Sequence, residues 1–219
     1  MPRKNLREVG GKPLLVWSVE LGNQAVTSGL VRRAIVSTDD REIADAARAA
    51  GGDVPFLRPP ELAGDRAKMA PVLHHAVLAM EAAEGIRYDW VLLLQPTSPF
   101  RTLDDLRAAL ALARAGGCDS VISVVQVSDV HPVLMKKIED DRLVPFCVPE
   151  PEGTRRQDYA PAAYMRNGAI YLTRRDVLVE RGSIWGDSIR PYVMPEERSL
   201  SIDTEMHLRL VDLLLREGS

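Results

Sequence analysis

The stretch VRRAIVSTDDREIADAARAAGG, residues 31–52, decides the fold. Its β-branched run over 31–37 predicts a strand, and a polar turn follows directly. Asp39 and Glu42 have the spacing of a capping box, so a helix is predicted over 41–50, ended by a pair of glycines. A strand that leads through an N-cap into a helix is one repeat of an α/β protein.

The same order of elements returns further along the chain. Strands are predicted at 90–94, 119–125, 167–173 and 189–194, and helices at 71–84, at 102–116 and from Thr204 to about Arg216, the last capped by Asp203. Strands that alternate with helices predict βαβ units, and hence a mostly parallel sheet in a single α/β domain over residues 1–219. From 127 to 161 the periodicity fades, which predicts a loop-rich excursion or a small β insertion.

Composition excludes several classes of function. A formal charge of -3 spread over both signs provides no basic stripe, so we expect no nucleic-acid partner, and any phosphate bound here belongs to a small molecule. The start of the chain has no apolar signal core, and no apolar run approaches the roughly 20 residues of a membrane span. We therefore expect a cytoplasmic protein without a membrane partner.

Two polar loops follow predicted strands. Ligands of parallel α/β folds bind beyond the carboxyl ends of the strands. This rule selects residues 37–39 and 95–99 as the place where a ligand is expected.

Six short segments carry a resemblance. They are PRKN at 2–5 followed by GKPL at 11–14, STDD at 37–40, RP at 58–59 with LA at 62–63 and Asp65, LQPTSPFR at 94–101, YMRNGAIY at 164–171 and IDTE at 202–205. In this order they resemble the acylneuraminate cytidylyltransferases, which make CMP-sialic acid and its legionaminic and pseudaminic relatives. The resemblance implies a Rossmann-like, three-layer nucleotidyltransferase fold, with residues 127–166 as an excursion for substrate binding and dimerisation. It also implies an enzyme that transfers CMP from CTP to a nine-carbon sugar acid and releases pyrophosphate.

The resemblance implies a nucleotide site and a metal ligand. Lys4 and Asn5 would face the triphosphate, and Arg58 and Ala67 would lie near the cytosine and ribose. Asp203 would hold Mg²⁺, a hard cation that takes carboxylate oxygens and keeps several waters. Lys4 and Asp203 are the candidate catalytic residues, because positioning and charge neutralisation do most of the work in phosphoryl chemistry.

The sugar site is expected at a strand end and along the excursion. Gln95 offers both donor and acceptor groups, and Arg156, Gln157, Tyr164 and Asn167 cluster in the excursion and its return strand. An arginine can bind the sugar carboxylate with two parallel hydrogen bonds, and the resemblance selects Arg156 for this.

The chain departs from the family pattern in two ways. Family members open with a strand and a phosphate-binding loop just before the position of Arg3, so the amino end is expected to be truncated. Ser201 stands where the metal site often has a second aspartate. Two alternatives stay open: a truncated, catalytically impaired homologue that acts in binding or regulation, and a Kdo-type cytidylyltransferase. A dehydrogenase is the least favoured alternative, because no GxGxxG motif follows a predicted strand. A homodimer is expected by resemblance alone.

Overall fold

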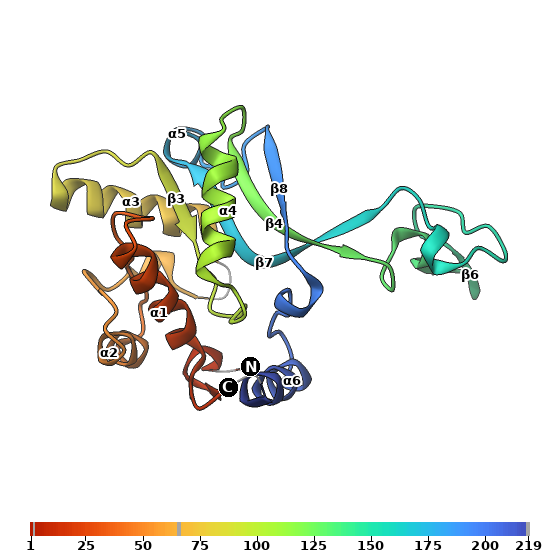
Figure 1. The fold of residues 1–219 in the computed structure, drawn as a ribbon, viewed down its shortest axis with the longest axis horizontal. Coiled ribbons are helices and arrows are strands. Elements are labelled where there is room, and N and C mark those ends of the chain that lie inside the picture. Colours follow the sequence, from red (N-terminus) through yellow and green to blue (C-terminus); the bar gives the residue numbers. More distant parts are fainter. Residues whose placement is uncertain (2, 65–66, 218–219) are drawn as a thin grey trace.

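A mixed β-sheet is the central layer of the computed structural model, which describes residues 1, 3–64 and 67–217 (Figure 1). Its strands lie in the order β3, β7, β4 and β8. They span Trp90–Leu93, Ala163–Arg174, Ser120–Val127 and Ile189–Val193, respectively. β8 is parallel to β4, whereas β7 is antiparallel to both of its neighbours. β3, β4 and β8 therefore run in one direction, as predicted for a mostly parallel sheet, and β7 is the exception.

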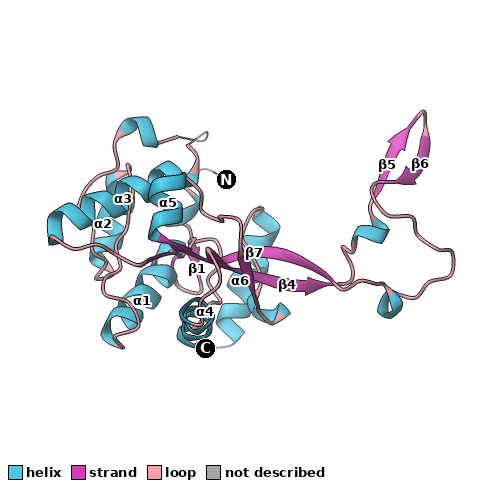
Figure 2. Cartoon of the chain, turned by 90° about the horizontal axis from the view of Figure 1, so that it is seen from above, coloured by secondary structure: helices cyan, strands magenta, loops and turns pink. Residues whose placement is uncertain are grey.

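Helices cover both faces of the sheet (Figure 2). On one face α1 (Leu14–Thr27) contacts α4 (Leu103–Arg114), and on the other α3 (Met69–Glu84) contacts α5 (Arg175–Arg181). α2 (Arg41–Ala49) packs against α1. The result is the three-layer α/β arrangement that the sequence predicts. Among the described helices, none has the length and the apolar character needed to cross a bilayer.

A large apolar cluster packs the sheet, and a smaller one holds the two ends of the chain together. The larger one packs α4 against the sheet through fully buried side chains such as Leu106, Ile170 and Leu172. The smaller one joins Val9 near the amino end to Ile202 and to α6 (Glu205–Glu217). Each large apolar side chain contributes about 1.5–3 kcal/mol when it is fully buried. The amino end is therefore anchored on the carboxyl-terminal helix.

Residues 31–37, predicted as a strand, belong to no sheet among the described residues. The Val36 amide donates to the Asp53 carbonyl at 2.8 Å, the Arg58 amide donates to the Thr38 carbonyl at 2.8 Å, and one parallel bridge joins Thr38 to Leu57. A regular strand needs a continuous ladder of such bonds. Among the described residues, the backbone of 33–37 is paired only on the side of residues 53–58.

At two helices the capping residue lies one position later than the sequence predicts. The side chain of Asp40 caps α2 by accepting from the amides of Glu42 and Ile43 at 2.7 and 3.3 Å, so Asp39 is not the cap. The Thr204 hydroxyl accepts from the His207 amide at 3.2 Å at the start of α6. An N-cap oxygen must reach the second or third amide of the helix, and these two side chains do so. The carboxylates of Asp39 and Asp203 are thereby left for other partners.

The excursion predicted at 127–166 is an arm that projects from the body, carried by the outer parts of β4 and β7 (Figures 1 and 2). It contains the hairpin of β5 (Lys136–Glu139) and β6 (Arg142–Pro145) and two short 3-10 helices, Pro132–Leu134 and Arg156–Asp158. The other small elements are η1 (Lys4–Leu6), β1 (Glu8–Val9), β2 (Lys12–Pro13) and the 3-10 helices Pro60–Leu62 and Glu196–Arg198.

Candidate active site

Lys4 and Asp203, from opposite ends of the sequence, lie side by side. The Lys4 ammonium donates to the Ile202 carbonyl at 2.8 Å and lies 3.8 Å from a carboxylate oxygen of Asp203. The Ile202 amide donates to the Thr97 carbonyl at 2.9 Å, which ties this segment to the loop after β3. The structure thus brings the two candidate catalytic residues next to the loop that begins with Gln95.

The carboxylate of Asp203 is available to a cation. Its side chain is 66% exposed, and Thr204 supplies the helix cap in its place. Among the described residues, no group of three or more His, Cys, Asp or Glu side chains could hold a metal ion. Asp203 alone would give Mg²⁺ one carboxylate ligand, and water and ligand oxygens would fill the other coordination positions. Proteins usually bind Mg²⁺ in this way.

A buried carboxylate holds the segment that leads to Asp203. Asp105, in the first turn of α4, accepts from Arg198 at 2.8 Å and from the Tyr192 hydroxyl at 2.8 Å. Burial opposes ionisation of Asp105, but the hydrogen bonds from Arg198, Thr102 and Tyr192 outweigh it and lower the pKa of the carboxyl. Burial together with the bond to Asp105 raises the pKa of Tyr192 to about 12. Nothing in the sequence of α4 marks Asp105 as buried, because acidic residues are also usual on exposed first turns.

Asn167, predicted to bind sugar, lies at the centre of a buried hydrogen-bond network. Its side-chain oxygen accepts from the Ser123 hydroxyl at 2.6 Å and from the Ala169 amide at 3.2 Å. Its nitrogen donates to Ser199 at 2.9 Å and lies 3.3 Å from the sulfur of Met194. The residue is 4% exposed, so a sugar contact would have to replace one of these partners. Its role in sugar binding stays a prediction.

Arg101 shapes the Gln95 loop from within. Its guanidinium donates to the carbonyls of Gln95 at 2.7 Å and Ala169 at 2.9 Å, and burial lowers its pKa to about 9. Gly168 has φ +75°, and a Cβ there would stand 3.1 Å from the Gln95 side-chain oxygen. Both the left-handed backbone and the close approach of Gln95 explain the glycine. The sequence shows Arg101 only as the end of a polar loop, so its burial was not foreseen.

Asn5, Arg58 and Gln95 line one cavity of about 1060 Å³, together with residues 37–39. Arg58 pairs with Asp39 at 3.2 Å and donates to the Ser37 carbonyl at 3.2 Å. The structure therefore places Asn5 and Arg58, two of the four predicted nucleotide residues, in one cavity with Gln95. Ala67 lies half-buried just before α3 and outside this lining, whereas Asp65 of the family pattern falls outside the described residues.

The predicted sugar residues of the arm lie elsewhere. Arg156 and Gln157, in a short 3-10 helix of the arm, are exposed, and Tyr164 on β7 is 51% exposed. The arm points away from α6 and the amino end (Figure 1). Within one chain, the structure does not bring these side chains to Lys4 and Asp203, because β4 and β7 carry the arm outward beyond the sheet. Their role in sugar binding stays a prediction.

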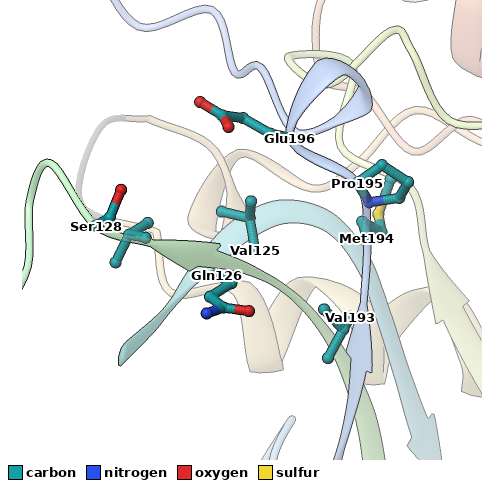
Figure 3. A pocket seen from close by; sticks show the side chains of 8 residues that line it. Val125, Gln126, Ser128, Val193, Met194, Pro195 and Glu196 are labelled. Atoms are coloured by element: carbon teal, nitrogen blue, oxygen red, sulfur yellow. The ribbon is translucent and has the colours of Figure 1, made fainter. Parts of the chain in front are cut away.

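A second, open pocket of about 430 Å³ lies at the base of the arm (Figure 3). It is formed where β4 and β8 end, the edge at which α/β folds bind ligands. Its lining mixes apolar side chains with Gln126, Ser128 and Glu196. These polar groups were not foreseen from the sequence.

Known proteins resemble this chain over nearly its whole length. Post-translational flagellin modification protein B of Campylobacter coli is 28% identical over 214 residues, which cover 98% of this chain and 88% of that protein. CMP-N,N'-diacetyllegionaminic acid synthase of Legionella pneumophila is 29% identical over 225 residues, covering 98% and 90%. A solved structure of CMP:2-keto-3-deoxy-manno-octonic acid synthetase complexed with CTP has the same fold, with a TM-score of 0.69, 19% identity, and coverage of 100% and 94%.

The family itself follows from a match over most of the sequence. The profile of the family described as Cytidylyltransferase matches residues 1–179, which include Lys4, Arg58, Gln95 and Asn167. Because this match spans far more than half of the 219 residues, the chain belongs to the cytidylyltransferase family.

Proposed function

We propose that this protein transfers CMP from CTP to a nine-carbon 2-keto sugar acid of the N-acylneuraminate type and releases pyrophosphate. The observation that carries the proposal is the meeting of Lys4 and Asp203 beside the Gln95 loop. A cation, an exposed carboxylate and a cavity lined by Asn5 and Arg58 form a site suited to a polyanionic nucleotide. A relative 29% identical over nearly the whole chain is named for CMP transfer to a legionaminic acid.

The reaction is an in-line displacement at phosphorus. The anomeric hydroxyl of the sugar attacks the α-phosphorus, a new O–P bond forms, the bond to the leaving pyrophosphate breaks, and the hydroxyl proton passes to solvent. When bound at Asp203, Mg²⁺ neutralises charge on the phosphate oxygens. Lys4 adds a positive charge from the chain itself, and Arg101 holds the Gln95 loop so that Gln95 can orient the sugar. Positioning of the reactants and neutralisation of their charge account for most of the rate enhancement, and no covalent enzyme intermediate is formed.

In this proposal the arm is the interface of a homodimer. Ile138, Leu143 and Phe146 on the arm are 77%, 72% and 61% exposed, and a large apolar side chain left in water loses about 1.5–3 kcal/mol relative to burial. We propose that a second copy covers these side chains and that Arg156, Gln157 and Tyr164 of one protomer serve the site of its partner. We place the enzyme in the cytoplasm, as the sequence predicts.

Release of pyrophosphate tests the proposed function. The purified protein is supplied with CTP and Mg²⁺ and with sialic, legionaminic, pseudaminic or Kdo acid in turn. We expect release with one of the nine-carbon acids and loss of release when EDTA removes the metal. Release with Kdo alone would assign the eight-carbon alternative, and CTP binding without release under any condition would assign a binding or regulatory role.

Asp203→Asn tests the metal site within the same assay. We expect turnover to fall at least about 100-fold with an unchanged circular dichroism spectrum, because one carboxylate supplies the protein's whole contribution to the cation. Glu205→Gln is the matched control: it removes the same charge two residues away, where Glu205 pairs with Arg7 at 2.9 Å. Near-normal turnover of Asp203→Asn would refute the metal role.

A further inference from the structure

The open pocket of about 430 Å³ at the base of the arm is separate from the cavity that holds Asn5 and Gln95 (Figure 3). We call it the base pocket. Its polar residues are Gln126, Ser128 and Glu196, and its apolar ones include Val125, Val193 and Met194. Among the described residues that line it, none is a lysine or an arginine, and one is a carboxylate. The base pocket is therefore unsuited to a phosphate or to the carboxylate of a sugar acid.

Part of the base pocket is an open strand edge. The Met194 amide donates to the Val124 carbonyl at 2.8 Å, and the pairing of β8 with β4 ends there, whereas β4 runs on to Val127. Backbone groups alternate between the two sides of a strand, so the amide and carbonyl of Gln126 point to the side on which β8 has ended. They have no hydrogen-bond partner on that side among the described residues. One donor and one acceptor therefore lie next to each other at the edge of the pocket.

The side chains around this edge provide a further acceptor and apolar surface. The Glu196 side chain is exposed, and its carboxylate forms no hydrogen bond or ion pair with a described residue. Val125 and Met194 are 6% and 2% exposed, so their apolar groups belong to the rigid interior. Apolar walls with a few placed polar groups are typical of a site for a small molecule.

An acylamino group matches this arrangement. Its carbonyl oxygen can accept from the Gln126 amide, and its N–H can donate to the Gln126 carbonyl or to the Glu196 carboxylate. Its methyl group can pack on Val125 and Met194, which removes apolar surface from water. A hydroxyl group in the same place would leave that apolar surface uncovered.

Two residues predicted to bind the sugar adjoin the base pocket. The side-chain nitrogen of Asn167 lies 3.3 Å from the sulfur of Met194, and a Cβ on the glycine that follows Asn167 would stand 3.1 Å from the Gln95 side-chain oxygen. Tyr164 is the cross-strand partner of Gln126, so these two side chains lie on the same face of the sheet. Asn167 thereby connects the base pocket to the loop that begins with Gln95.

We propose that the base pocket binds an acylamino group of the sugar acid while the anomeric end of the same molecule lies at Gln95. This inference rests on the proposed function, in which the acceptor is a nine-carbon acid of the N-acylneuraminate type. Kdo carries no acylamino group and would leave the open groups of Gln126 without a partner. A pocket built to pair with a polar group rejects a substrate that lacks it. The base pocket would therefore select N-acylated nine-carbon acids against Kdo.

Saturation-transfer NMR on N,N'-diacetyllegionaminic acid tests the proposal. The sample contains CMP and Mg²⁺, and because CMP has no pyrophosphate to release, no turnover occurs. Val193→Trp fills the base pocket from β8, whereas Ile189→Trp adds the same ring outside the lining, at a position that is 46% exposed against 50% for Val193. We expect saturation of an acetyl methyl group in wild type and in Ile189→Trp. In Val193→Trp the dissociation constant of the acid should rise at least about 10-fold.

A pair of glutamate variants tests the acceptor. Glu196→Ala should raise the dissociation constant of N,N'-diacetyllegionaminic acid at least about 3-fold, because the acylamino N–H loses a charged partner. Binding of CMP and of Kdo should stay unchanged, which a general loss of structure would not allow. Glu197→Ala is the matched control, because Glu197 lies outside the lining and 3.8 Å from Arg198.

Three results would overturn the proposal: no methyl saturation in wild type, equal binding by Val193→Trp and Ile189→Trp, or equal binding by the two glutamate variants. These measurements need no turnover, so they separate the base pocket from the enzyme activity. Methyl saturation without pyrophosphate release would refute the proposed function alone. Pyrophosphate release together with unaltered binding by Val193→Trp would refute the role of the base pocket alone.

Discussion

At the scale of single residues, buried charges position the exposed ones. Arg101 and Asp105 lie inside the fold, where Arg101 holds the Gln95 loop and Asp105 holds the segment before Asp203. Arg198 links α4 to the segment before Asp203, because it pairs with Asp105 and lies five residues before Asp203. A buried ion pair of this kind costs stability when one partner is removed.

Asp105→Asn should destabilise the fold in a pH-dependent way. The pKa of Asp105 is lowered in the folded state, so its contribution is present above the unfolded value of about 3.9 and is lost as the pH falls through the folded value. We expect a loss of about 2 kcal/mol in the free energy of unfolding at pH 7. The difference from wild type should shrink as urea unfolding is repeated from pH 4 downward.

The control for this measurement is Asp104→Asn on the same turn of α4. The Asp104 side chain is 85% exposed, so its replacement should change the unfolding free energy by no more than about 0.5 kcal/mol. A gap between Asp105→Asn and wild type that stays constant down to pH 2.5 would contradict the assigned role of the charge.

At the scale of elements, the choice of the N-cap residue decides which neighbouring carboxylates do not cap a helix. α4 begins with a complete capping box, in which Thr102 and Asp105 each satisfy a backbone amide of the other. At α2 and α6 the caps are Asp40 and Thr204, and the neighbouring carboxylates of Asp39 and Asp203 face the site. A carboxylate next to the N-cap residue is therefore available to bind a ligand, whereas the N-cap side chain itself is occupied by backbone amides.

Thr102→Ala should weaken α4 through its amino-terminal cap. Loss of an N-cap hydroxyl costs about 1 kcal/mol, and here the Asp105 side chain also loses a donor. Thermal unfolding measures the effect against Thr27→Ala, which makes the same change at an exposed position at the end of α1. If the two variants melted at the same temperature, the capping box would contribute nothing measurable.

At the scale of the whole molecule, the arm and the body have different surfaces. Met206 on α6 of the body is 77% exposed, but in the hairpin of β5 and β6 two apolar side chains that pair across the strands, Ile138 and Leu143, are both presented to solvent. Exposed apolar patches on a projecting element are typical of protein interfaces. The proposed homodimer is the assembly in which this surface would be covered.

Ile138→Asp should dissociate the proposed dimer. A charge in place of an apolar side chain would have to be buried without a partner, at a cost of several kcal/mol. Sedimentation should show the mass of a dimer for wild type and of a monomer for the variant. Lys137→Asp places the same charge on the opposite face of β5 and should leave the dimer intact. Dimers formed equally well by Ile138→Asp would exclude the hairpin as the interface.

The sequence by itself determined most helices and strands, because an apolar run or a helical period reports local burial. It indicated the edge at which a ligand is expected, and the resemblance selected Lys4, Arg58 and Asp203 as candidate site residues. It missed α1 and α5, and it predicted a strand at 31–37 where the structure has only one paired edge. Whether an extended segment joins a sheet depends on a neighbour that local sequence does not specify.

Tertiary structure alone decided what lies next to what. It placed Lys4 against Asp203, buried Asn167 in a hydrogen-bond network, and sent Arg156 outward on the arm. The physical reason is that these relations depend on contacts between residues far apart in the chain, whose free energies come from packing and from pairing of buried polar groups. The local pattern of apolar and polar residues does not show which distant residue a side chain will contact.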